Sequence, residues 1–338
     1  MAEAATARPG LLPRATDYGR TLTFRVRRRW TTRFSDLELQ QLKSLRRAYG
    51  GARGPDLLLF GDSNMLWVNW GERDQRKLDQ IVKDQLGGVD IETVVGGGYN
   101  PRVVVPFLEA LRQLPSRPRA VVVPTSVLMA TSTWLAHPVL GLEIRGRQLA
   151  EVVRRGGPMP KRLWVPDEGA WEAYDRLPIP SLIGPARTTG ELRMFADAAP
   201  TSRWQHLVRL RHLLDYYNAE TLDADSPGVV LVREMGALLR EMDIPSVAHI
   251  SPINHEMATK LLGPKARDHI ARNAEVVESA YQAGAGDLGA VVNGAFDCPS
   301  SEFSDPAHVN EAGRRRFGAA IADAVRPFLD PSHRKAPV

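Results

Sequence analysis

The sequence predicts an α/β protein built on a parallel β-sheet, with a helical insertion. Three short apolar runs, at 56–60, 91–95 and 120–124, are typical of strands that are buried on both faces. Stretches with helical apolar spacing separate them. Because parallel neighbours need a crossover connection, this alternation indicates a parallel sheet. Two further strands are expected near the C-terminus, at 247–250 and 288–292.

Length and composition limit the class of protein. The 338 residues make one large domain or two modest ones, and 43% hydrophobic with 25% charged residues excludes wholesale disorder. The single cysteine, Cys298, excludes a disulfide framework and a thiolate zinc cluster. No apolar run reaches the ~18 residues that span a bilayer. The first residues contain no continuous apolar segment of the kind that secretory signals carry, so we expect a cytoplasmic protein without a membrane span.

The positive charge is concentrated at the N-terminus. Residues 1–53 hold 12 Lys/Arg against 4 Asp/Glu, a net of +8, whereas the remainder holds 32 against 35, a net of −3. This predicts a basic N-terminal arm and helix over 1–54. The arm either contacts an anionic partner or surface, or is a solvated extension that folds back on the body. It contains no recognised nucleic-acid motif, so we do not expect nucleic acid as a partner.

The expected helices begin and end at recognisable signals. Ser35 and Glu38 form a capping-box pattern, Gly87-Gly88 end a helical stretch, and Asn310 is a good N-cap before the last helix. These signals, with the apolar spacing, predict helices near 36–48, 65–86, 103–114, 229–242, 265–283 and 311–329.

One long segment interrupts the alternation of strands and helices. About a hundred residues, 126–227, show no obvious strand and are rich in Trp, Pro and Arg. We interpret this segment as a largely helical insertion that caps one end of the sheet. The predicted organisation is therefore the arm, one α/β domain over 55–330 that carries the insertion, and a loose tail over 331–338.

The strongest local signal is Gly61-Asp62-Ser63-Asn64, directly after the first strand. Open α/β sheets bind ligands at the carboxyl ends of their strands, and a helix start there offers unpaired backbone N–H groups. Ser63 is therefore a candidate nucleophile. The alternative is that Ser63 only caps the helix that follows.

A serine nucleophile needs a base and a group that orients the base. His308 comes just before the last helix, and Asp305 precedes it by three residues, across an Asp-Pro turn. The turn can fold the carboxylate onto one imidazole nitrogen, leaving the other free to face a serine hydroxyl. The alternative is a surface turn with a solvated histidine.

Together the two motifs resemble the SGNH (GDSL-like) hydrolase family, over roughly 55–125 and 245–328. The resemblance implies a flavodoxin-like three-layer α/β/α fold and a triad in which Ser63 is the nucleophile, His308 the general base and Asp305 its orienting group. It also implies oxyanion donors from the serine N–H, a glycine N–H and an asparagine side chain. The block Gly96-Gly97-Gly98 matches the family's glycine, with Gly97 or Gly98 as the donor.

The sequence departs from the family pattern after the third strand. The family has an asparagine there, whereas in this chain Ser126 or Thr125 occupies the matching place. A replacement donor is Asn254, in a Pro-x-Asn turn after the fourth strand. That turn looks like a branch of the family linked to O-acylation of polysaccharides and cell-wall polymers. The alternative is that Asn254 bonds its own backbone in a turn.

These features predict a serine-dependent hydrolase of acyl esters or thioesters, or an acyltransferase, working through an acyl-enzyme. The substrate is expected to be a small-molecule or carrier-linked acyl compound, and no cofactor is expected. No metal-ligand spacing and no dinucleotide fingerprint is present. A catalytically weak binding or scaffold protein of the same fold, holding a partner with its basic arm, is the rival interpretation. The sequence sets no oligomeric state.

Overall fold

The structure, a computed structural model, describes residues 43, 54–138, 146–147, 150, 168–197 and 202–330. The basic arm and helix predicted for 1–54 lie outside the described residues except at positions 43 and 54, and so does the predicted tail, 331–338. The division into arm, domain and tail therefore stays a prediction.

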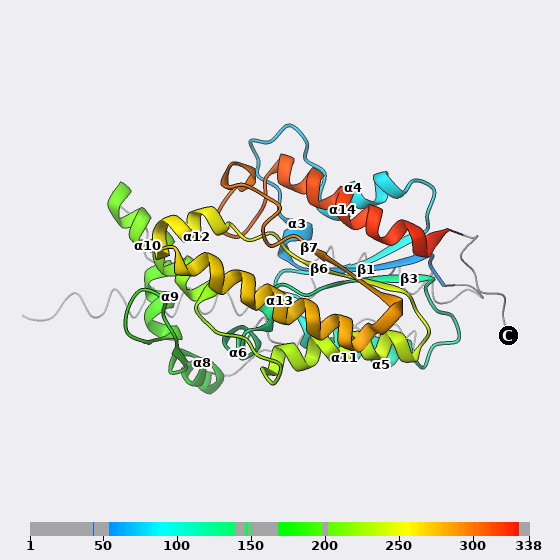
Figure 1. Ribbon diagram of the computed structural model, residues 1–338, viewed down its shortest axis with the longest axis horizontal. Coiled ribbons are helices and arrows are strands. Elements are labelled where there is room, and N and C mark those ends of the chain that lie inside the picture. The colour runs from blue at the N-terminus through cyan, green and yellow to red at the C-terminus, as the bar shows by residue number, and fades with distance from the viewer. Residues whose placement is uncertain are drawn as a thin grey trace, which may run out of the picture.

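A five-stranded sheet forms the centre of the protein (Figure 1), and all four of its strand pairings are parallel. The strand order is β2-β1-β3-β6-β7, which is the flavodoxin-like order of a doubly wound sheet. The predicted α/β class is thereby confirmed. The strands are β1 (Leu57–Gly61), β2 (Ile91–Val95), β3 (Ala120–Pro124), β6 (Ser246–Ile250) and β7 (Gly289–Asn293).

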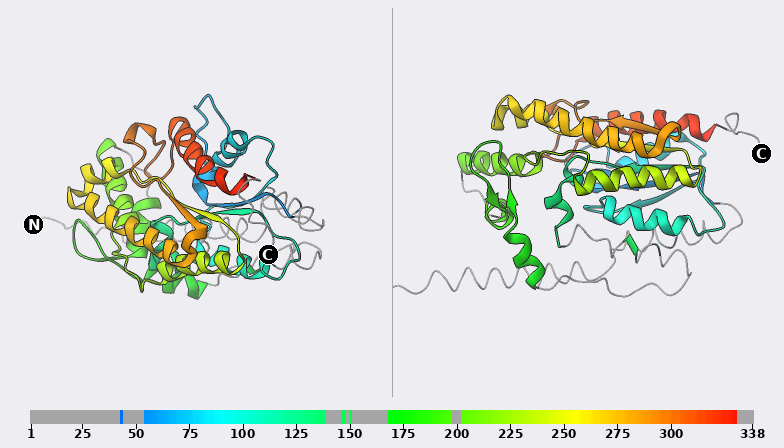
Figure 2. Two further views of the ribbon diagram at one scale, coloured as in Figure 1. Left: turned by 45° about the vertical axis from the view of Figure 1, so that its right-hand side comes forward. Right: turned by 60° about the horizontal axis from the view of Figure 1, so that its bottom comes forward.

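Helices cover both faces of this sheet and complete three layers (Figures 1 and 2). On β1, Leu58 and Phe60 point into one core and Leu57 and Leu59 into the other, and all four are fully buried. This explains why the strand is apolar throughout. The first core is closed by α5 (Pro101–Leu111), α11 (Pro227–Glu241) and α13 (Lys265–Ala285), and the second by α4 (Leu78–Leu86) and α14 (Glu311–Leu329).

Two glycines allow α11 and α13 to lie in close contact. A Cβ atom on Gly284 would lie 2.1 Å from the carbonyl oxygen of Arg233, and one on Gly236 would lie 2.7 Å from the backbone nitrogen of Ala285. Real Cβ atoms do not approach backbone that closely. Any larger residue at either position would push the two helices apart.

The predicted helical insertion is mostly helical where the structure describes it. It contains α6 (Ser132–Leu135), α8 (Glu168–Asp175), α9 (Thr189–Asp197) and α10 (Arg203–Asn218), and it lies beyond one end of the sheet with α12 (His255–Leu262) (Figure 1). It also holds a strand pair that was not obvious in the sequence, because β4 (Pro178–Ile179) and β5 (Arg187–Thr188) form a small antiparallel pair. Strands of two residues are too short to leave an alternating pattern in the sequence.

The continuous helix expected over 65–86 was wrong. The first helical turn, α3 (Ser63–Leu66), ends where the backbone N–H of Trp67 donates to the Ser63 carbonyl oxygen at 2.9 Å. Residues 67–77 then run without regular helix until α4 begins. This segment is mostly polar. It makes short-range turn bonds, such as the Glu72 N–H to the Asn69 carbonyl oxygen at 3.1 Å, and it also bonds to the C-terminal part of the chain through Glu311 and Ser304.

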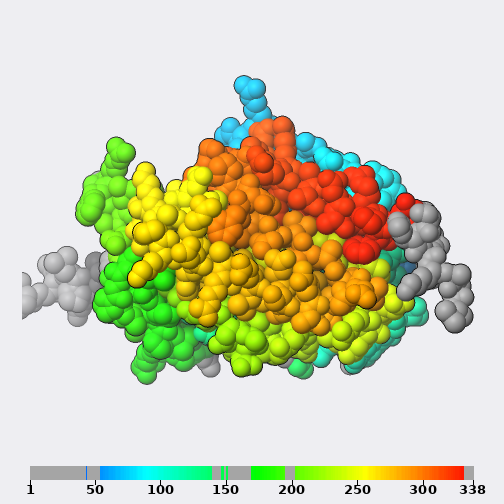
Figure 3. All heavy atoms as spheres, in the orientation of Figure 1, coloured from blue at the N-terminus to red at the C-terminus, as the bar shows by residue number. Residues whose placement is uncertain are grey.

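The space-filling view shows that α12, α13 and α14 form most of one face of the molecule, with the insertion at one end (Figure 3). Among the helices that the structure describes, none is both long and apolar enough to cross a membrane.

Candidate active site

Ser63 lies at the carboxyl end of β1, as the first residue of α3. Gly61 permits the sharp turn between them, because a Cβ atom there would lie 2.2 Å from Cγ of Met65. The N-cap of the helix is Asp62, whose Oδ1 accepts from the backbone N–H of Asn64 at 2.8 Å. The capping role that was the alternative for Ser63 is thus filled by its neighbour, and the Ser63 hydroxyl is left for another partner.

Asp62 is fully buried beneath this turn. Burial raises the pKa of its carboxyl group, against the opposing effects of the Asn64 backbone and of the nearby His308. The Ser251 hydroxyl, after β6, lies 3.5 Å from Asp62 Oδ2. The carboxyl ends of β1 and β6 therefore meet at this edge of the sheet.

The partner of Ser63 comes from the other end of the chain. Nε2 of His308 lies 3.2 Å from Oγ of Ser63. Nδ1 of the same ring lies 2.8 Å from Oδ2 and 3.0 Å from Oδ1 of Asp305. The structure thus brings together all three residues of the predicted triad, in an unbroken chain of hydrogen-bonding distances.

The loop that holds Asp305 and His308 is closed by its own backbone. Phe303 and Val309 form an isolated antiparallel bridge, and the Ser304 N–H donates to the His308 carbonyl oxygen at 2.9 Å. Inside the loop, Asp305 Oδ1 accepts from the backbone N–H groups of Ala307 and His308, both at 2.8 Å. The backbone of the short loop therefore orients the Asp305 carboxylate independently of the imidazole ring.

These contacts keep the Asp305 carboxyl group ionised and determine which nitrogen of His308 carries the proton. Burial would raise the pKa of Asp305, but hydrogen bonds from the His308 ring and from the two backbone N–H groups lower it below its ordinary value overall. A carboxylate can only accept, so the imidazole proton lies on Nδ1 and Nε2 carries the lone pair that faces Ser63. This is the tautomer that can take a proton from a serine hydroxyl.

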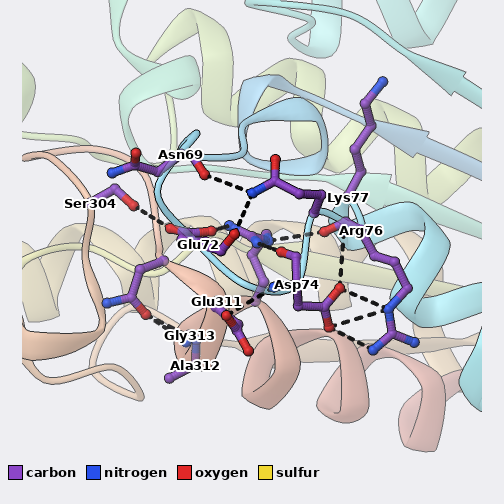
Figure 4. A network of polar contacts seen from close by, with 12 residues as sticks. Asn69, Glu72, Asp74, Arg76, Lys77, Ser304, Glu311, Ala312 and Gly313 are labelled. Carbon is purple, nitrogen blue, oxygen red and sulfur yellow. Dashed lines mark hydrogen bonds and ion pairs between the residues drawn. The ribbon is translucent and has the colours of Figure 1, made fainter.

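A network of charged side chains ties the segment after Ser63 to the segment that carries His308 (Figure 4). Glu72 accepts from the Ser304 hydroxyl at 2.9 Å and forms an ion pair at 2.5 Å with Arg314, whose side chain is fully buried. Arg314 also donates to the Asp74 carbonyl oxygen at 2.8 Å, and Glu311 accepts from the backbone N–H of Asp74 at 3.1 Å. We call Glu72, Glu311 and Arg314 the clamp.

The glycine block lies in the loop between β2 and α5. Gly97 is exposed, with open space where a Cβ atom would be, and Gly98 has a φ of 76°, which favours glycine. The loop is fastened at both ends, because the Gly96 N–H donates to the Gly61 carbonyl oxygen at 3.2 Å and the Asn100 side chain donates to Gly98. It therefore starts beside the turn that carries Ser63.

The two remaining candidates, Ser126 and Asn254, lie after neighbouring strands. Ser126 follows β3 and is almost completely buried. Asn254 is fully buried and caps α12, with its Oδ1 accepting from the Met257 N–H at 3.2 Å and from the Ser300 hydroxyl at 2.6 Å. Within the described part of the chain, these contacts of Asn254 include neither Ser63 nor His308.

Two aromatic residues near the triad were missed in the sequence. Trp67 stacks on the ring of His308, with the ring centroids 4.7 Å apart. Tyr217, on α10 of the insertion, is close enough that the charge of Asp305 contributes, after burial, to raising its pKa. Position 67 lies one helical turn after Ser63, a spacing that could have drawn attention to Trp67, whereas no local pattern distinguishes Tyr217.

Comparison with known proteins gives little. No family model matches the sequence, and no curated protein matches it. Among solved structures, one titled "Structure of the Inhibitor bound form of M. Smegmatis Aryl Esterase" is similar at 14% identity, with a TM-score of 0.31, covering 80% of this chain and 98% of that chain. A likeness this distant assigns no activity, and the geometry of the site has to support the function by itself.

Proposed function

We propose that this protein is a serine-dependent acyl-ester or thioester hydrolase, or an acyltransferase, of the SGNH type that its motifs resemble. The observation that carries the proposal is the chain of contacts from Ser63 Oγ to His308 Nε2, at 3.2 Å, and from His308 Nδ1 to Asp305 Oδ2, at 2.8 Å. A nucleophile, a base and a group that orients the base at these separations are the parts that covalent acyl transfer requires.

The reaction proceeds in two halves. Ser63 Oγ attacks the carbonyl carbon of the ester while its proton passes to His308 Nε2, and Asp305 stabilises the imidazolium that forms. The tetrahedral intermediate collapses, the bond to the leaving oxygen or sulfur breaks, and His308 returns the proton to that atom. Water or an acceptor alcohol then attacks the acyl carbon while its proton passes to His308. The bond between the acyl carbon and Ser63 Oγ breaks, and His308 returns the proton to Oγ, which releases the acid or the new ester and restores Ser63.

The oxyanion of the tetrahedral intermediate needs donors on the far side of the carbonyl. We assign two backbone N–H groups to this role, those of Ser63 and of Gly97 or Gly98. For a third donor, Ser126 and Asn254 are the candidates. If Asn254 serves only as a cap, its replacement by alanine should cost about 1 kcal/mol of stability and leave acylation unchanged, whereas loss of an oxyanion donor should slow acylation by about 10²-fold or more.

The proposal is tested with p-nitrophenyl acetate in stopped flow. We expect a burst of nitrophenol equal to the enzyme concentration, followed by slower turnover, and no burst in Ser63→Ala. The exposed Ser279→Ala variant, on α13, is the matched control and should keep the burst. A folded wild-type protein with no burst and no turnover on activated esters or thioesters would favour the binding-protein interpretation instead.

A further inference from the structure

Trp67 is in contact with the imidazole of the triad, although packing of the core does not require it. The rings of Trp67 and His308 are nearly parallel, with 20° between their planes and 4.7 Å between their centroids. Trp67 is 46% exposed. A large aromatic ring that stays half in water gains little from core burial, so its contact with His308 calls for another explanation.

The same residue is also connected to the nucleophile. The backbone N–H of Trp67 donates to the carbonyl oxygen of Ser63 at 2.9 Å and so closes the only turn of α3. Its side chain then covers one face of the ring that reaches Ser63 Oγ. One residue therefore links the helical turn that carries the hydroxyl to the imidazole that would remove the proton.

We propose that Trp67 is a positioning residue for His308, which holds the imidazole in line with Ser63 Oγ and favours the positive charge that the ring carries during acyl transfer. This inference rests on the proposed function. The face of an indole ring is electron-rich, and a cation placed over it is attracted to it. Two acidic groups among the described residues also act on His308, namely the carboxylate of Asp305 and the buried Asp62.

The clamp fixes the segment that begins with Trp67 (Figure 4). Glu72 lies five residues after Trp67. It ties the segment to the His308 loop through Ser304 and to α14 through Arg314. Trp67 is thus held at one side by α3 and at the other by the clamp. This explains how a half-exposed ring keeps a fixed orientation against the imidazole.

The kinetic test distinguishes an effect of the aromatic face of Trp67 from an effect of the size of its side chain. In burst experiments with p-nitrophenyl acetate, Trp67→Leu should lower the acylation rate constant about tenfold, equivalent to about 1.4 kcal/mol, with the substrate's dissociation constant changed less than twofold. Trp67→Phe, which keeps an aromatic face, should recover most of that rate. Trp70→Leu is the matched control, because Trp70 lies in the same segment and is 98% exposed, and it should leave both constants unchanged.

A second measurement needs no turnover. A protonated imidazole quenches the fluorescence of a stacked indole more strongly than a neutral one, so wild-type emission should fall on acidification. This step should be absent in Trp67→Phe and in His308→Gln, and present in Ser63→Ala. Equal acylation in Trp67→Leu and wild type overturns the inference, as does an emission step that survives in His308→Gln. If wild type shows no acyl transfer, the proposed function fails while the emission step still decides the stacking.

Discussion

Asp305 receives hydrogen bonds from two sources at once, and this defines its role at the scale of a single residue. Two backbone N–H groups of its own loop hold Oδ1, and the His308 ring bonds to the same carboxylate. The loop therefore keeps the carboxylate ionised and oriented whether or not the imidazole is charged. This arrangement explains how a side chain that is about one-third exposed can still hold the imidazole in one tautomer.

Asp305→Asn should lower the acylation rate at least 10²-fold at pH 7.5. The amide can donate to Nδ1, which forces the imidazole proton onto Nε2 and removes the lone pair that faces Ser63. The measurement is the burst rate with p-nitrophenyl acetate. Asp297→Asn, an exposed aspartate before the same loop, is the control and should retain the wild-type rate. An Asp305→Asn protein as fast as its control would contradict the triad.

The triad could be predicted from the sequence because each half is local. Ser63 stands in a turn directly after a strand, and His308 follows Asp305 by three residues, so short-range patterns identify both. Trp67 could not be assigned in this way, because its contact with His308 depends on how two segments from opposite ends of the chain pack together. For the same reason the sequence does not reveal the polar contact of Asn254 with Ser300, which lies far from it along the chain.

At the scale of the elements, the strands of the central sheet were predicted well and the connections between them less well. Strands buried on both faces are continuous apolar runs, and α14 begins where Asn310 accepts from the backbone N–H groups of Ala312 and Gly313. The interruption over 67–77 was missed because its cause is the clamp, in which Glu72 bonds to Ser304 and Arg314. Helix propensities depend on neighbouring residues, so they do not reveal hydrogen bonds to the other end of the chain.

Gly284→Ala tests the close contact between α11 and α13. Helix propensity alone favours alanine by about 1 kcal/mol, but its Cβ would lie 2.1 Å from the Arg233 carbonyl oxygen, which is backbone and cannot swing away. Because overpacking typically costs about 1–3 kcal/mol, we expect a net loss of up to about 2 kcal/mol in the free energy of unfolding by urea. Ser279→Ala, on the exposed side of α13, should cost nothing. An alanine variant more stable than wild type would show that the helices are less tightly packed.

At the scale of the whole molecule, the three layers bury polar groups close to the site. His249, on β6, is fully buried and its ring lies edge-on to Phe317 of α14, with the centroids 5.6 Å apart. Burial lowers the pKa of His249 to about 4, although the Phe60 backbone acts in the opposite direction. The folded protein therefore holds this imidazole neutral at pH values where the unfolded chain binds a proton.

This burial predicts a loss of stability on acidification. In the unfolded chain His249 has an ordinary pKa near 6.5, so its contribution is fully present above pH 6.5 and is lost as the pH falls toward 4. The whole effect is up to about 3 kcal/mol of unfolding free energy. Urea unfolding of wild type and His249→Gln from pH 7.5 to 4.5 measures it, since glutamine does not titrate. If the difference between the two proteins does not change over this range, His249 does not remain neutral and buried.

The central claim is that His308 activates Ser63, and the most direct measurement is covalent labelling by a fluorophosphonate. We expect one adduct per protein, located by mass spectrometry on the peptide that contains Ser63, and no adduct in Ser63→Ala. His308→Ala should unfold at the wild-type urea concentration but be labelled at least 10²-fold more slowly, because the hydroxyl has lost its base. A folded wild-type protein that leaves Ser63 unlabelled, or a His308→Ala variant labelled at the wild-type rate, would contradict the account.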